Sequence, residues 1–160
     1  MKKLAKNNKG FSLVELIVVI AIMAVLVGVL APQLIKYVEK SRQATDIQNC
    51  DSIATTLKTY FADKEGLTGT VTATVSTGSD VACAVPSGGT AQIATDAGTA
   101  LSDAGLTATR LKGSQWYGNI TITYDCGTGQ ITYNAQSDNY TTGNTAAATS
   151  SEIKPGKGVK

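Results

Sequence analysis

The feature that most constrains this chain is an almost unbroken apolar run from Phe11 to Ile35. As a helix, roughly 25 residues rise about 37 Å, enough to cross a hydrocarbon core of about 30 Å. An ordinary secretory signal has a shorter apolar core, and Pro32 would directly follow its cleavage-like sequence Val29-Leu30-Ala31. The rigid proline ring fits an extended protease groove poorly. The run therefore favours a membrane-spanning helix over a removed secretory signal.

The basic charge of the chain is concentrated before this run. The chain has 14 basic and 12 acidic residues, and four of the basic ones are Lys2, Lys3, Lys6 and Lys9. Such a cluster stays in the cytoplasm and directs the chain beyond the apolar run to the outside. We expect a single-pass protein of the cytoplasmic membrane with a cytoplasmic N-terminus. The near-neutral remainder argues against a specific nucleic-acid partner.

Glu15 lies one turn into the apolar run. A carboxylate in a membrane segment costs a few kcal/mol and is a functional candidate. Ser12 and Glu15 also have the S-x-x-E spacing of a helix capping box, which offers a purely structural role. Both roles stay open from the residues alone.

The segment KGFSLVELIVVIAIMAVLVGVLAP resembles the class III signal and N-terminal helix of type IV pilins and pseudopilins. The resemblance implies that a prepilin peptidase cleaves between Gly10 and Phe11 and methylates the new N-terminus of Phe11. It implies an assembly role for Glu15 and a helix kink at Pro32. Pro32 cannot donate a hydrogen bond to the carbonyl of Gly28, itself a weak helix former, so this pair marks the expected kink. The matching segment covers about 25 residues, and the rest carries no comparable signature.

The chemistry of this segment also fits a polymer. After cleavage, Phe11 would carry a cationic amine, and a neighbouring subunit shifted by about one turn would bring its amine to Glu15. Such a buried ion pair sets register between packed helices. Burial of the apolar surface, at roughly 25 cal/mol per Å², would hold the helices together.

The helical pattern continues beyond the membrane segment, and a helix is predicted from about Ser12 to Glu65. Its apolar stripe is Ile47, Cys50, Ala54, Leu57 and Phe61, widened by Ile53 and Tyr60. Asp46, Asp51, Lys58 and Asp63 are expected to lie off this stripe. Gly66 is the expected left-handed residue after the helix.

The remainder predicts strands and one short helix. Thr70–Ser76 and Asp80–Val85 form one expected hairpin, and Gly118–Cys126 and Gln130–Ala135 form another. A short helix is expected over Ala91–Ala104. Trp116 and Tyr117 allow either core packing at a strand start or a binding patch. One apolar sheet face needs a cover, so we predict an α+β fold in which a long N-terminal helix packs on a small antiparallel sheet. The resemblance implies that this is the pilin fold.

These patterns divide the chain into five parts. They are a cleaved leader (1–10), a transmembrane and filament-core segment (11–35), an amphipathic helix (36–66), an α+β head (67–135) and a flexible polar tail (136–160). An alternative for the tail is a late strand at the sheet edge near Tyr140.

The three cysteines, Cys50, Cys83 and Cys126, leave their pairing open. Export permits a disulfide, and an odd count leaves at least one thiol unpaired within a subunit. Cys50–Cys126, Cys83–Cys126, Cys50–Cys83 and three buried thiols are the alternatives. No cysteine follows Cys126, so the disulfide-closed C-terminal loop common in Gram-negative pilins is missing or built differently. This departure favours a Gram-positive-like pilin.

Three functional classes follow from these observations. The first is the structural subunit, as a major pilin, of an extracellular type IV pilus for adhesion, aggregation or motility. Its partners would be copies of itself, the prepilin peptidase and the membrane assembly machinery. The second is a pseudopilin of a type II secretion or DNA-uptake system. A membrane-anchored enzyme ranks last, because the chain lacks histidine and any nucleophile, cofactor or metal motif. We expect no catalytic residues, metal or cofactor.

Overall fold

The computed structural model describes residues 10–64, 66–135, 140–141 and 153–155. The chain forms two compact units, Met1–Val38 and Glu39–Lys160. Each unit is described separately below. The predicted leader and most of the predicted tail lie outside the described residues.

One long helix, α1 (Leu13–Ala62), runs through both units. Its only proline is Pro32, and the helix continues through Gly28 and Pro32 without a break in secondary structure. Gly66 follows with φ 77°, the left-handed conformation expected there. The predicted helix is confirmed to within three residues at its C-terminal end.

The second unit contains a four-stranded antiparallel sheet of strand order β2-β1-β3-β4. The strands are β1 (Thr70–Val75), β2 (Ala82–Ser87), β3 (Ile120–Asp125) and β4 (Ile131–Asn134). β1 pairs with both β2 and β3, and β3 pairs with β4, so both predicted hairpins are confirmed. β5 (Tyr140–Thr141) pairs with β6 (Lys154–Pro155) in a separate two-stranded sheet, which is not the edge strand considered near Tyr140.

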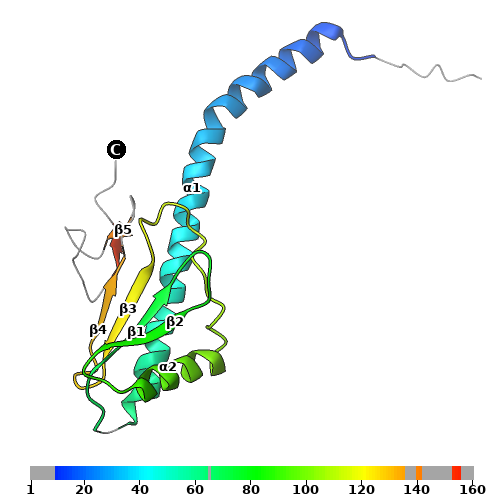
Figure 1. Ribbon diagram of the computed structural model, residues 1–160. Helices are drawn as coiled ribbons and strands as arrows, with labels where there is room; N and C mark the ends of the chain where they lie inside the picture. Colours follow the sequence, from blue (N-terminus) through cyan, green and yellow to red (C-terminus); the bar gives the residue numbers. More distant parts are fainter. Residues whose placement is uncertain (1–9, 65, 136–139, 142–152, 156–160) are drawn as a thin grey trace, which may run out of the picture. The chain divides into compact units, whose positions relative to one another are not determined.

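The sheet has one buried face, which packs on the part of α1 that begins at Glu39 (Figure 1). In β3, Ile120, Ile122 and Tyr124 are buried and alternate with more exposed residues. Phe61 of α1 stacks on Tyr124 with ring centroids 5.7 Å apart. The expected cover of the sheet by the helix is therefore confirmed.

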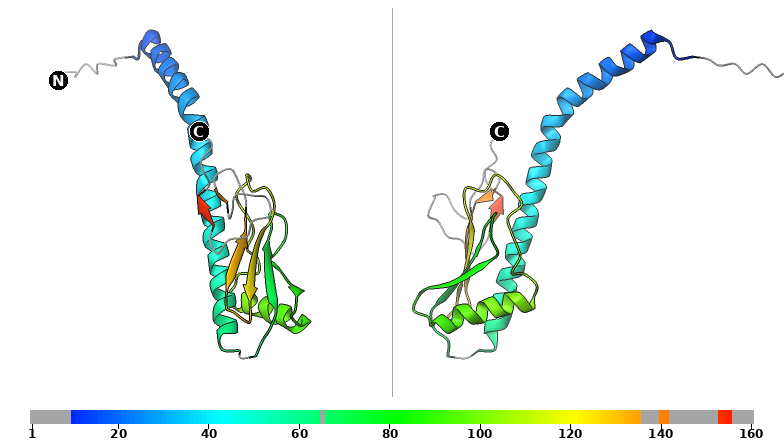
Figure 2. Two further views of the ribbon diagram at one scale, coloured as in Figure 1. Left: turned by 90° about the vertical axis from the view of Figure 1, so that its left-hand side faces the viewer. Right: turned by 45° about the vertical axis from the view of Figure 1, so that its right-hand side comes forward.

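Helix α2 (Ala91–Asp103) crosses near the C-terminal end of α1 and closes that end of the core (Figure 2). It buries Ile93, Ala97, Ala100 and Leu101. Spacings of three and four residues put these side chains on one helical face. The second unit is thus an α+β head, as predicted.

Candidate functional site

The residues implied in processing and assembly lie in the first turn of α1 and directly before it. The backbone N–H of Ser12 donates to Oε2 of Glu15 at 2.9 Å, and the N–H of Leu16 donates to the carbonyl of Ser12 at 3.2 Å. Glu15 therefore accepts the bond that a capping-box acid accepts at the third helical position. Phe11 is 81% exposed, and Gly10 is exposed as well. The capping bond predicted for Glu15 is confirmed, and its role in assembly stays a prediction.

Every described residue from Gly10 to Val38 is exposed within the protein. This surface is far more apolar than a soluble monomer presents to water, so it needs lipid or another protein surface. α1 is long and apolar enough to cross a membrane. Its large apolar side chains include Leu13, Leu16, Ile17, Ile20, Met23, Leu26 and Leu30.

Two buried carboxylates join α1 to the loop before β3. Oε1 of Glu39 accepts bonds from the backbone N–H groups of Ser114 at 2.5 Å and Gln115 at 3.0 Å. Asp46 accepts bonds from three donors, the N–H groups of Lys112 and Gly113 and the indole Nε1–H of Trp116, at 2.8–3.0 Å. Glu39 is 7% exposed and Asp46 is 1% exposed. We call Glu39, Asp46 and residues 112–116 the carboxylate clamp.

The clamp requires a glycine at position 113. A Cβ atom there would lie 2.7 Å from Cγ of Gln43, 2.9 Å from Nε1 of Trp116 and 3.1 Å from Oδ2 of Asp46. Only a residue without a side chain lets the loop approach the helix this closely. The loop backbone is therefore fixed against α1 on both sides of Gly113.

The prediction that Asp46 lies off the buried stripe is wrong. The buried stripe of α1 is Glu39, Gln43, Asp46, Cys50, Ile53, Ala54, Leu57 and Phe61. Its three- and four-residue steps extend toward the N-terminus through polar side chains, and Ile47 is only half-buried. Asp46 was predicted to be exposed because it is charged, and a buried charge is uncommon unless it is hydrogen-bonded. Its spacing of four residues from Cys50 would have placed it on the buried stripe.

The core-packing interpretation of the Trp116–Tyr117 pair is confirmed for Trp116, and the binding patch stays a prediction. Trp116 is 9% exposed and its ring nitrogen is bonded to Asp46, so it belongs to the core. Tyr117 is 64% exposed. The pair therefore has one buried and one exposed aromatic residue.

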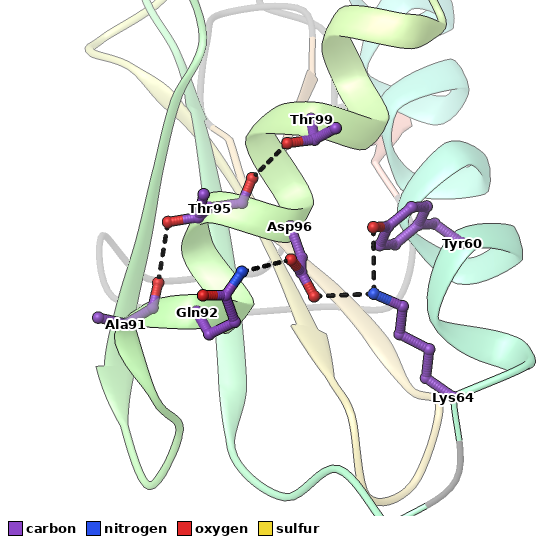
Figure 3. Close-up of polar contacts among 7 residues, drawn as sticks. All are labelled: Tyr60, Lys64, Ala91, Gln92, Thr95, Asp96 and Thr99. Atoms are coloured by element: carbon purple, nitrogen blue, oxygen red, sulfur yellow. Dashed lines mark hydrogen bonds and ion pairs between the residues drawn. The ribbon is translucent and has the colours of Figure 1, made fainter.

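A second polar cluster joins the C-terminal end of α1 to α2 (Figure 3). Nζ of Lys64 donates to Oδ2 of Asp96 at 2.8 Å and to the hydroxyl of Tyr60 at 3.1 Å, and Gln92 donates to Oδ1 of Asp96 at 2.8 Å. The bond to Asp96, followed by the bond to Tyr60, raises the pKa of Lys64. The bonds from Lys64 and Gln92 lower the pKa of Asp96. This half-buried pair remains open to solvent, so it orients side chains more than it stabilises the fold.

All three cysteines are described, and all three are free thiols, so none of the disulfides considered from the sequence is formed. The Cys83–Cys126 pair is too far apart. Cys83 lies in β2 and Cys126 directly follows β3, and these strands are separated by β1, so they lie about 10 Å apart. A disulfide allows a Cα separation of at most about 7 Å. The Cys50–Cys126 pair is separated along α1. Cys126 lies two residues after Tyr124, whose ring stacks on Phe61, and Cys50 lies about 16 Å before Phe61 along the helix. Burial, together with the nearby carboxylates of α1, raises the pKa of Cys50 to about 12.

Comparison with known proteins identifies the N-terminal segment. Residues 5–31 match the family described as the prokaryotic N-terminal methylation motif. The chain is 34% identical over 59 residues to the type IV major pilin protein PilA of Myxococcus xanthus (strain DK1622). This match covers 37% of the chain and 27% of the relative, so the chain spans about a quarter of the length of that pilin. No solved structure gives a significant match.

The fold and the N-terminal turn define a class of protein. A long, exposed apolar helix with a carboxylate in its first turn continues into a helix that carries a small antiparallel sheet. This is the arrangement of a pilin-like α+β subunit. The methylation motif and the similarity to a major pilin show that the N-terminal part of the chain resembles that of type IV pilins.

Proposed function

We propose that this protein is the structural subunit, as a major pilin, of a type IV pilus. The leader 1–10 is removed, the helix from Phe11 anchors the subunit in the cytoplasmic membrane, and the same helix then forms the core of an extracellular filament. The observation that carries the proposal is Glu15. It is the one charged residue among residues 13–35, a segment of the helix that is exposed and, apart from Gln33, otherwise apolar.

The proposed mechanism pairs charges between subunits. Cleavage between Gly10 and Phe11 creates a cationic amine at Phe11, which the peptidase methylates. In the filament, that amine lies beside Glu15 of a neighbouring subunit shifted by about one helical turn. Each charge then has a partner, which removes most of the cost of burying it in an apolar bundle. The Gly28–Pro32 segment is the proposed point at which the helix bends as subunits pack.

Two variants separate this role from simple helix capping. Glu15→Gln keeps a capping oxygen, since glutamine also serves in capping boxes, but removes the charge. Glu15→Ala removes both. We expect both variants to enter the membrane and to be processed, and both to be lost from sheared surface filaments. Ser12→Ala leaves the charge in place and serves as the matched control, with filament yield near wild type.

Filament yield is measured by shearing and electron microscopy, and processing by mass spectrometry of the mature N-terminus. A mature chain beginning at Phe11 with an added methyl group supports the processing step. Wild-type filament yield from Glu15→Gln would leave capping as the sole role of Glu15. An uncut Met1 or a start at Pro32 would overturn the proposed cleavage.

The cleavage site is tested further by size at position 10. A Cβ on Gly10 would meet no atom of the chain within 4 Å, so the protein itself tolerates a side chain there. We expect Gly10→Ala to be processed better than Gly10→Val, because the peptidase site should disfavour a large side chain at position 10. Equal processing would argue against a steric requirement.

A pseudopilin of a secretion or DNA-uptake system is the second candidate function, since the methylation motif does not distinguish the two classes. A major pilin would be abundant in sheared filaments, whereas a pseudopilin would remain cell-associated.

A further inference from the structure

The head has an apolar hollow between its two helices. The hollow, of about 370 Å³, lies between Thr55, Thr59 and Tyr60 of α1 and Ala100 and Asp103 of α2. The hydroxyls of Thr55 and Thr59 each donate to the carbonyl four residues earlier, at 2.8 and 2.9 Å. Because these donors are satisfied within α1, the threonines offer mainly their methyl groups to an incoming side chain. The hollow therefore suits an apolar or aromatic group.

The C-terminal end of this hollow is pre-formed. The hydroxyl of Tyr60 accepts a bond from Lys64, which also binds Asp96 of α2 (Figure 3). Nζ of Lys64 lies 4.2 Å from the centre of the Tyr60 ring, within the range of a cation–π contact. Tyr60 is thus fixed between the two helices, and a partner need not order it on binding.

A matching projection occurs elsewhere on the same head. Among the described residues from 39 onward, Tyr117 is the one large apolar or aromatic side chain that is exposed, at 64%. It directly follows Trp116, whose indole is bonded to Asp46 in the carboxylate clamp. Tyr117 therefore projects from a loop whose backbone is held in place, as a rigid aromatic anchor does in a protein interface.

The projection and the hollow lie at different levels along α1. The loop that carries Tyr117 is bound at Asp46, whereas the hollow begins at Thr55, about 14 Å further along the helix. A contact between Tyr117 of one copy and the hollow of a parallel neighbour therefore requires the two copies to be displaced along the helix axis by about this distance. A contact between two different surfaces of the same chain is heterologous, and such a contact repeats along a helical filament when its rotation does not close into a ring.

Charge supports the same pairing. Lys112, in the loop that carries Tyr117, is exposed, and Asp103 at the hollow is exposed as well. Opposite charges around an apolar contact favour the correct register between two surfaces.

We propose that the hollow between α1 and α2 receives Tyr117 of a second copy of this chain, with Lys112 of that copy beside Asp103. This contact would join heads along the filament, in addition to the helix packing in its core. It rests on the proposed function, because it requires a filament of identical subunits.

Photo-crosslinking in assembled filaments tests the contact. A benzoylphenylalanine placed at position 117 of the full chain is irradiated in sheared filaments, and the crosslinked peptides are identified by mass spectrometry. We expect intermolecular products with peptides that contain residues 55–60 or 100–104. Filaments whose products lie only elsewhere would overturn this inference and leave the pilus proposal intact. Failure of the wild-type chain to form filaments would overturn both.

Substitutions give a second, independent measurement. Tyr117→Ser should lower filament yield by about tenfold, the effect of losing an interface anchor, whereas Tyr117→Phe should retain it. Lys112→Glu and Asp103→Lys should each reduce the crosslink from position 117, and the double variant should restore it. Recovery in the double variant supports direct pairing, because two merely destabilising changes would add. A double variant no better than either single variant would overturn the pairing.

Discussion

Removal of the Asp46 carboxylate should destabilise the head strongly. Asp46→Ala leaves the N–H of Gly113 and the indole N–H of Trp116 buried without their acceptor, and it releases the N–H of Lys112 as well. A buried donor without a partner costs about 1–3 kcal/mol. Two such donors would cost about 2–6 kcal/mol, partly offset because the buried charge is also removed. We expect the free energy of unfolding to fall by about 3 kcal/mol.

Asp46→Asn should cost less, about 2 kcal/mol, because one oxygen still accepts while the new amide group faces N–H donors. Asp63→Asn is the matched control. Asp63 is an exposed residue near the end of the same helix region, so its substitution should change the free energy of unfolding by at most about 0.5 kcal/mol.

Urea unfolding of the full chain in detergent micelles measures these differences. Trp116 is the only tryptophan, and its ring is bonded to Asp46, so its fluorescence reports on this loop while circular dichroism follows the fold. A loss of 3 kcal/mol should lower the urea midpoint by about 1.5–2 M. A midpoint for Asp46→Ala equal to that of Asp63→Asn would refute the view that the clamp holds the loop on the helix.

Three further predictions follow from other contacts of the head. Tyr133→Phe should cost about 1 kcal/mol, read from thermal unfolding, because the Tyr133 hydroxyl donates to Asp51 at 2.9 Å. Gly69→Ala should cost about 2 kcal/mol or more in the same assay, since Gly69 has φ 103° and a Cβ there would lie within 2.6 Å of the facing backbone. Burial, then the Asp46 and Asp51 carboxylates, raise the pKa of Cys50 to about 12. The unfolded thiol ionises from about pH 9 while the folded thiol stays protonated, so stability should fall between pH 9 and 12, by up to about 1.4 kcal/mol per pH unit. Cys50→Ala should show a smaller decline in urea unfolding at pH 8, 9 and 10, and an unchanged slope would contradict this assignment.

The elements of the fold were predictable because their signals are local. Apolar spacing predicted α1 and α2, and alternation around Gly127-Thr128-Gly129 predicted the hairpin of β3 and β4. The apolar face of β3 and the stripe of α1 also predicted that sheet and helix meet, as the stacking of Phe61 on Tyr124 confirms.

The carboxylate clamp was not predictable in the same way. Glu39 and Asp46 have polar side chains at positions that spacing assigns to the buried face. Apart from the indole of Trp116, the groups that donate to them are backbone N–H groups some seventy residues later. Almost every residue type carries a backbone N–H group, so the sequence does not indicate which residues donate such bonds. The disulfide alternatives were undecided for a related reason, since they depend on strand order, which places β1 between Cys83 and β3.

The buried stripe of α1 has an apolar part that stabilises the head and a polar part that positions the 112–116 loop. From Ile53 to Phe61 the stripe is apolar, and burial there stabilises the head without strict geometry. From Glu39 to Asp46 it is polar, and each carboxylate accepts only donors in fixed positions, so this part sets where the 112–116 loop lies. The polar turns also separate, in the sequence, the apolar segment before residue 39 from the apolar core after it. A continuous apolar stripe would let the sheet shift along the helix toward the apolar segment before residue 39, and buried carboxylates with fixed hydrogen-bond partners oppose that shift.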